Sequence, residues 1–167
     1  MSNLITTFSL LRLSRFLLSL SLVISSMVAC AAETVSIENA WVRPTFPGQD
    51  VGAAYMTFNS KQDVTLISVS SDATDSVEIH SMSMQNGVMK MRMLENLPIK
   101  AGKPYKLEPG GFHLMLFDLK KPLTAGNFVN FELTFRAGNA EFKQSIKAPI
   151  KTLADTEEHD HSHHHHH

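Results

Sequence analysis

Hydrophobic and polar residues alternate in short runs along most of this chain, and turn residues separate the runs. Successive side chains of a β-strand point to opposite faces of a sheet, so a period of two residues is typical of strands. No window of a dozen residues shows the apolar period of a helix. This all-β pattern predicts a β-sandwich or small barrel with antiparallel, Greek-key connections. The predicted strands cover residues 35–42, 53–59, 64–70, 77–84, 88–94, 104–107, 113–118, 128–135 and 141–146.

Residues 1–32 have the composition of a secretory signal peptide. Two arginines and no acidic residue accompany an apolar stretch of 13 residues at 16–28, and small residues follow it. The stretch is too short to span a bilayer as a stable helix, which disfavours a retained anchor. Two processing routes stay open. Cleavage near Ala31 or Ala32 would release the protein, whereas lipidation of Cys30 would hold it at a membrane.

The remaining residues 33–154 have the length of a single globular domain. The chain has 15 Lys and Arg against 16 Asp and Glu, and this balance argues against a nucleic-acid-binding protein, which would present a basic face. A single Cys excludes an intrachain disulfide and a Cys-based zinc finger. The sequence shows no nucleophilic side chain accompanied by a general base, and no two carboxylates at a spacing typical of acid–base catalysis. It also lacks a phosphate-binding glycine motif. We therefore expect a binding protein rather than an enzyme.

Residues 155–167 contain no apolar side chain to bury and are predicted to form a disordered, solvated tail. Its imidazoles, with four carboxylates nearby, suit Cu(II), Zn(II) or Ni(II). A native second site for oxidised copper and a purification tag are both consistent with this composition. The presence of the signal peptide, and of His159 and His161 outside the terminal run of histidines, favours a native tail. The candidate ligands are His159, His161, His163, His164, His165, His166 and His167.

Residues 80–93 are predicted to form a β-hairpin closed by Asn86-Gly87. Asn-Gly is the favoured pair for a two-residue type I′ turn, because both central residues adopt positive φ. This turn pairs Gln85 with Val88 and, further from the turn, His80 with Met93. Strand alternation then separates sulfur and imidazole from the polar side chains. One face holds His80, Met82, Met84, Met89, Met91 and Met93, and the other holds Ser81, Ser83, Gln85, Val88, Lys90 and Arg92.

The methionine face has a structural and a chemical interpretation. Flexible methionines fill irregular cores, and for any one of them packing is the simpler explanation. However, strands usually build cores from β-branched and aromatic residues, and a histidine at the end of five methionines is unusual. His113-Leu114-Met115 adds an imidazole and a thioether that share one face of a strand. Two imidazoles and two thioethers form a soft, uncharged donor set, which selects Cu(I) over zinc, calcium or magnesium.

The four residues His80, Met91, His113 and Met115 are separated by ten, twenty-one and one residues. This order and spacing resemble the motif of the PCu(A)C copper chaperones. The likeness extends over roughly residues 35–147. It includes the segments AWVR at 40–43, GVMKMR at 87–92 and PGGFHLML at 109–116.

The resemblance implies a secreted, cupredoxin-like or immunoglobulin-like β-sandwich that binds one Cu(I) through these four residues. It implies a periplasmic metallochaperone that delivers copper to the CuA centre of a cytochrome c oxidase subunit during assembly, alongside thioredoxin-fold copper-transfer proteins. Periplasmic copper buffering or tolerance is the alternative binding function. A structural β-sandwich whose methionine face is only core is the alternative from another class.

We expect structural roles for other residues near the four proposed ligands. Trp41 is expected to anchor the core and Phe112 to shield His113. The methionines outside the motif are expected to pack in the core, with a secondary role as a soft lining or as transient ligands. These are Met82, Met84, Met89 and Met93.

Overall fold

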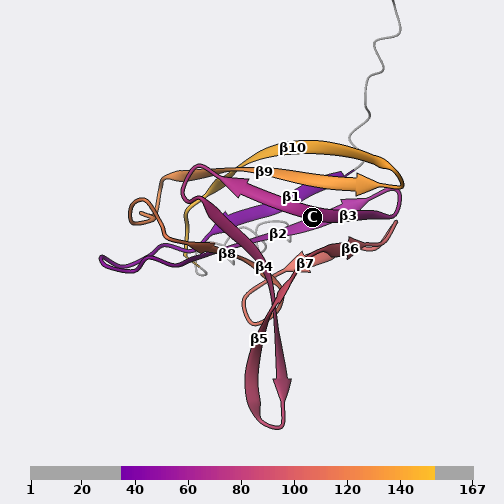
Figure 1. Ribbon diagram of the computed structural model, residues 1–167. Helices are drawn as coiled ribbons and strands as arrows, with labels where there is room; N and C mark the ends of the chain where they lie inside the picture. Colours follow the sequence, from indigo (N-terminus) through magenta and orange to yellow (C-terminus); the bar gives the residue numbers. More distant parts are fainter. Residues whose placement is uncertain (1–34, 153–167) are drawn as a thin grey trace, which may run out of the picture. The chain divides into compact units, whose positions relative to one another are not determined.

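The structure is a computed structural model that describes residues 35–152 as ten β-strands (Figure 1). All nine predicted strands are present, and their ends differ from the prediction by at most three residues. The one additional strand of the described residues, β6, was not predicted, because its central proline argues against a strand. The predicted signal peptide and histidine tail lie outside the described residues. The strands are β1 Val35–Val42, β2 Gly52–Ser60, β3 Val64–Ser71, β4 Ser76–Gln85, β5 Val88–Leu94, β6 Leu97–Ile99, β7 Tyr105–Leu107, β8 His113–Phe117, β9 Phe128–Ala137 and β10 Ala140–Pro149.

The strands form two sheets that pack face to face around one hydrophobic core. The first sheet has the order β1-β2-β8-β4-β5, with β7 also pairing with β2, and the second has the order β10-β9-β3-β6. Every pair of named strands is antiparallel, and some neighbours, such as β2 and β8, are far apart in sequence. This arrangement confirms the predicted cupredoxin-like, antiparallel β-sandwich. Within residues 35–152, no helix is long and apolar enough to cross a membrane.

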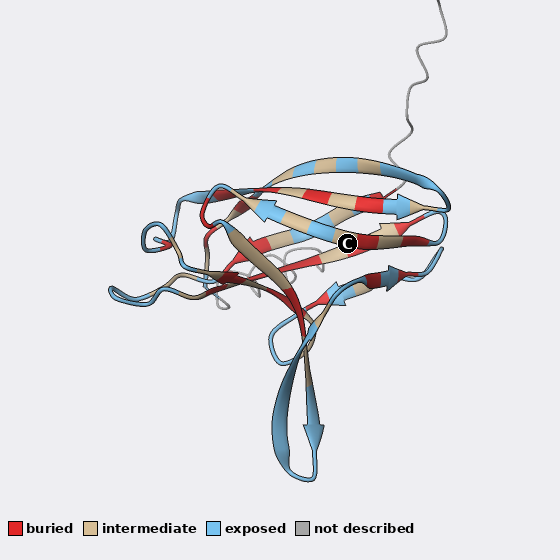
Figure 2. Cartoon of the chain, viewed as in Figure 1, coloured by how far each residue is buried: buried red, intermediate tan, exposed pale blue. Residues whose placement is uncertain are grey.

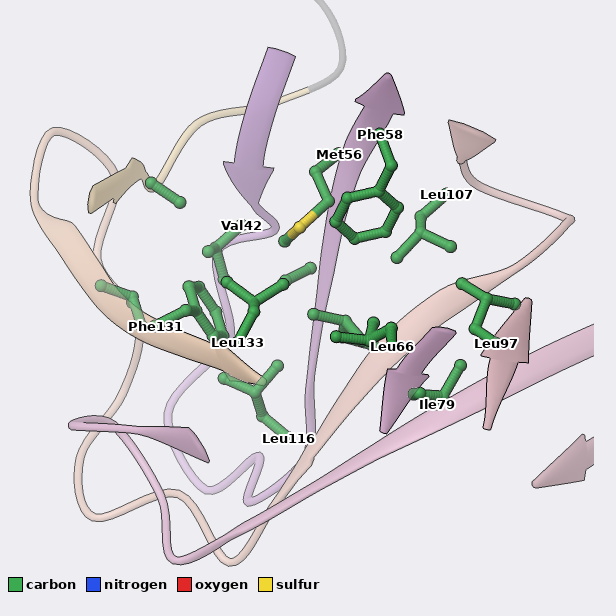
Figure 3. Close-up of a cluster of buried hydrophobic side chains, with 14 of the residues drawn as sticks. Val42, Met56, Phe58, Leu66, Ile79, Leu97, Leu107, Leu116, Phe131 and Leu133 are labelled. Carbon is green, nitrogen blue, oxygen red and sulfur yellow. The ribbon is translucent and has the colours of Figure 1, made fainter. Parts of the chain in front are cut away.

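The core is built from the inward-facing residues of both sheets (Figure 3). In β9, Val129, Phe131, Leu133 and Phe135 are buried, and the residues between them are half-buried or exposed. The ring of Phe58 from the first sheet meets Phe135 edge-on, with 5.9 Å between the ring centroids. Burial of such side chains supplies most of the favourable free energy that holds the two sheets together.

β4 and β5 form the predicted hairpin in the predicted register. The pairs run from Gln85–Val88 at the turn to His80–Met93, and both turn residues have positive φ. On its other side, β4 pairs with β8 only from Ser76 to His80. Residues 81–93, which we call the ribbon, therefore form a two-stranded extension of the sheet that projects from the sandwich in Figure 1. Most of this ribbon is exposed in Figure 2.

Replacing Leu133 with Ala should lower the free energy of unfolding by about 2–5 kcal/mol, because this fully buried side chain would leave a cavity. The adjacent Thr134 points to the other face of β9 and is half-exposed, so Thr134→Ala should cost about 1 kcal/mol or less. Chemical denaturation of the two variants measures the difference. Equal losses would contradict the assignment of the core face.

Candidate metal centre

His80 and His113 lie directly opposite each other on adjacent strands of the first sheet. They are partners in the β4–β8 ladder, and their ring centroids are 5.8 Å apart. Their neighbours Ile79 and Leu114 belong to the core, so strand alternation places both imidazoles on the outer face of the sheet. Both histidines are nevertheless buried, with exposures of 8% and 4%. The fold thus brings together the two imidazoles that the sequence spacing selected.

Glu78 orients the imidazole of His80. Its Oε2 atom lies 2.7 Å from Nε2 of His80. A carboxylate accepts hydrogen bonds, so Nε2 carries the proton and donates it, and in the neutral ring Nδ1 holds a lone pair. Nδ1 is buried and has no hydrogen-bond partner. An unpaired buried acceptor costs free energy, and a bound cation would recover it.

A backbone carbonyl orients His113 in the opposite tautomer. Nδ1 of His113 lies 3.1 Å from the carbonyl oxygen of Gly111, which can only accept a hydrogen bond, so the proton is on Nδ1. The lone pair of His113 is therefore on Nε2. Burial lowers the pKa of His113 from its ordinary value of 6.5, and the hydrogen bond to Gly111 offsets only part of this effect. The ring is neutral at pH 7, so it binds a metal ion without first releasing a proton.

Met115 lies on the same outer face, two residues along β8 from His113. Its partners are Glu78 on β4 and Ala53 on β2. The side chain is half-buried and lines a shallow depression together with Arg43. Two imidazoles, one carboxylate and one thioether are therefore neighbours on a single patch of the sheet.

Met91 lies on the ribbon, diagonally across from His80. The residue directly opposite His80 is Met93, and Met91 is paired with Met82 one row further out. Met91 is 49% exposed, and its atoms line a hollow with polar residues of the ribbon. The register thus brings two thioethers of β5 within one row of His80: the predicted Met91 and its neighbour Met93.

The expectation that the methionines outside the motif pack in the core is wrong. Met84, Met89 and Met93 are 64%, 44% and 53% exposed, and Met82 is half-buried. The reason is that β5 is an edge strand and the ribbon extends past the last residue of β4 that pairs with β8. The same exposure rules out the interpretation of the methionine face as core of a purely structural sandwich.

Two neighbours of the imidazoles were not predicted from the sequence. Glu78 contacts His80, and the ring of Phe117 lies 5.9 Å from the same imidazole. Glu78 precedes His80 by two residues, and Phe117 follows His113 by four. The alternation that selected the histidines would therefore have placed both residues on the same face.

Two aromatic residues differ from their expected surroundings. The ring of Phe112 packs edge-on against Tyr105, at 5.2 Å between centroids, and lies against the core, so the expected shield over His113 is wrong. Trp41 is buried, as expected, but it packs on Tyr55 at 4.5 Å on the outer side of the first sheet. Aromatic residues therefore bury part of the outer face as well as the core.

The donor atoms of this patch suit a soft metal ion. His80 and His113 each hold one ring nitrogen with a free lone pair, and thioethers lie on the same face. Within residues 35–152, no three side chains of His, Cys, Asp and Glu are grouped to hold a metal ion. The unpaired, buried Nδ1 of His80 and the neutral sulfur donors fit copper in its reduced state.

The fold and the patch define a class: a β-sandwich domain with an imidazole–thioether site on the outer face of one sheet. Residues 35–149 match the family described as "Putative lipoprotein LpqE-like". The chain belongs to this family, which is the family of PCuAC domains.

This chain is similar to individual relatives in sequence and to solved structures in fold. "Putative lipoprotein Lxx21020" of Leifsonia xyli subsp. xyli is 27% identical over 129 residues, which cover 77% of this chain and 76% of the relative. The solution structure of CuI-DR1885 from Deinococcus radiodurans is similar with a TM-score of 0.58 and 26% identity, covering 78% of this chain and 87% of that one. The copper-bound PCuAC domain from PmoF2 has a TM-score of 0.57 and 23% identity, covering 72% of this chain and 95% of that domain, and this likeness concerns the fold alone.

Acidification should destabilise the domain through His113. Below pH 6.5 the unfolded chain protonates this residue, whereas the folded chain resists protonation because its pKa is lowered, so stability falls as the pH falls from 6.5 towards the folded pKa. In His113→Gln, this part of the pH dependence should be absent. Denaturation curves at pH 7.5 and 5.5 measure it in both proteins, and an identical pH dependence would contradict the neutral, buried state of His113.

Proposed function

We propose that this protein is an exported copper chaperone that carries one Cu(I) ion bound by His80, Met91, His113 and Met115. The observation that supports this function best is the pair of facing, buried imidazoles, each of which keeps one nitrogen lone pair free. Membership of the PCuAC family and the Cu(I) form of the similar protein DR1885 support the same metal.

The donor set favours Cu(I) on chemical grounds. Thioethers are soft, neutral ligands, whereas calcium and magnesium require oxygen and zinc gains little from neutral sulfur. Two neutral imidazoles and two thioethers leave the ion with only its own single charge, which favours the reduced metal. The site also contains no thiol that an oxidising compartment could convert to a disulfide.

The unequal exposure of the ligands fits a carrier. His80 and His113 are buried, Met115 is half-buried and Met91 is 49% exposed. Ligands of a recipient can therefore replace the thioethers first, while the imidazoles still hold the ion. Stepwise exchange of this kind transfers copper without releasing it into water.

The recipient in this proposal is the CuA centre of cytochrome c oxidase, reached together with thioredoxin-fold copper-transfer proteins, as the family resemblance implies. The lipoprotein descriptions of the family and of the Leifsonia relative support export. In this proposal the protein works in the periplasm, either held at a membrane by a lipid on Cys30 or released by cleavage near Ala31 or Ala32. The histidine tail, outside the described residues, would add a site for Cu(II).

Replacing Met91 with Leu should weaken Cu(I) binding by at least about tenfold, because leucine keeps the volume and removes the sulfur donor. Met93→Leu is the matched control on the same face and strand, and should change the affinity by less than about threefold. Competition with a colorimetric Cu(I) chelator measures the affinity of both variants. His113→Ala should lose tight Cu(I) binding in the same assay. Weak, unchanged binding in all proteins would end the copper proposal, and a larger loss in Met93→Leu would replace Met91 by Met93 as the ligand.

Deleting the gene should lower cytochrome c oxidase activity in cells grown at low copper, because the CuA centre would not be filled, and added copper should restore it. The wild-type chain should complement the deletion, whereas His113→Ala should not. Copper sensitivity with normal oxidase activity would instead support buffering.

Truncation after residue 154 should remove Cu(II) binding and leave Cu(I) binding unchanged if the tail is a separate site.

A further inference from the structure

The ribbon presents methionines as cross-strand pairs. Met84 faces Met89, and Met82 faces Met91. In a two-residue hairpin the pair beside the turn is hydrogen-bonded, and the two kinds of pair alternate from there. Both methionine pairs are therefore of the non-hydrogen-bonded kind, in which the Cα atoms are about 4.5 Å apart and the side chains are closest.

The outermost pair is exposed on a ribbon that no further strand of residues 35–152 covers. Met84 is 64% exposed and Met89 is 44% exposed. Exposed strand positions do not require a long, flexible apolar side chain, and such a side chain adds little packing there. The opposite face of the ribbon contains no sulfur and is mostly polar, with Ser83 paired with Lys90 and Val88 as its apolar exception. The restriction of sulfur to one exposed face therefore has no explanation in the packing of the fold.

We propose that Met84, Met89 and Met82 form a second, exposed Cu(I) site near the tip of the ribbon, separate from the site at the buried imidazoles. Met84 and Met89 supply two thioethers from one close pair. Met82 lies on the same face two residues before Met84, about 7 Å along the strand, within reach of a long unbranched side chain. Neutral sulfur ligands select soft monovalent copper, so the site takes Cu(I) and its analogue Ag(I).

The ribbon site has a further role as the uptake point for the buried site, and this role rests on the proposed function. Successive rows of the ribbon face are about 7 Å apart, and each contains at least one soft ligand. Copper moves inward by exchanging one thioether for the next; it remains Cu(I), and no electron or proton is transferred. Binding strengthens inward because imidazoles replace thioethers and burial excludes water. The rows are Met84–Met89, Met82–Met91 and His80–Met93.

The test is an anaerobic Cu(I) titration of the full-length protein against a competing chelator, with NMR detection of the methionine methyl groups. The wild type should show two steps: the first shifts the signals of the buried site, and the second shifts those of Met84 and Met89. The double variant Met84→Leu/Met89→Leu should lose the second step and keep the first, because leucine retains the volume without the sulfur. The control Gln85→Leu/Val88→Leu places the same residues at the adjacent pair on the opposite face, and should keep both steps.

A second step that persists in the Met84→Leu/Met89→Leu protein, or that is absent from the wild type, would overturn the ribbon site. His113→Ala should remove the first step and leave the methyl shifts of Met84 and Met89. If the wild type shows those methyl shifts but no step that depends on His113, the carrier function fails and the ribbon site stands. Stopped-flow loading of the buried site should also be slower in the Met84→Leu/Met89→Leu protein, and an unchanged rate would overturn the uptake role.

Discussion

The pairing of β8 beside β4 is the constraint on which the metal centre depends. Leu114 and Leu116 of β8 and Ile79 of β4 are buried in the core, and their burial sets the register between the two strands. A shift of one residue would turn Leu114 outward and His113 inward, which hydrophobic burial opposes. The core therefore positions His80 and His113 opposite each other, although neither imidazole belongs to it.

Local hydrogen bonds then prepare the two imidazoles in different ways. Glu78 holds the proton of His80 on Nε2, and the carbonyl of Gly111 holds the proton of His113 on Nδ1. The free lone pairs are consequently on different ring atoms of the two residues. At metal sites, histidine ligands commonly donate their second ring N–H to a carboxylate or a carbonyl oxygen. This hydrogen bond fixes the tautomer and the orientation of the ring before the metal binds.

The ribbon contrasts with this buried patch, because its structure depends on local interactions. A single turn at Asn86 and Gly87 sets its register, and within residues 35–152 no second layer of strands covers its exposed methionines. The turn chemistry made every pairing of the hairpin predictable from the sequence. The burial of Met84 and Met89 was predicted wrongly, because burial depends on which other strands lie nearby and not on the strand itself. β6 was not predicted for a related reason: a central proline argues against a strand, and the segment becomes one only through pairing with β3.

The sequence by itself determined the strands, the hairpin register and the identity of the soft donors, because alternation, turn residues and side-chain chemistry are local properties. It also placed His113 and Met115 on one face of one strand. Only the tertiary structure decided that β8 lies next to β4, that Glu78 and Phe117 adjoin His80, and that most methionines of the ribbon are exposed. These features join residues distant in sequence, and they depend on how two sheets share one core rather than on any segment alone.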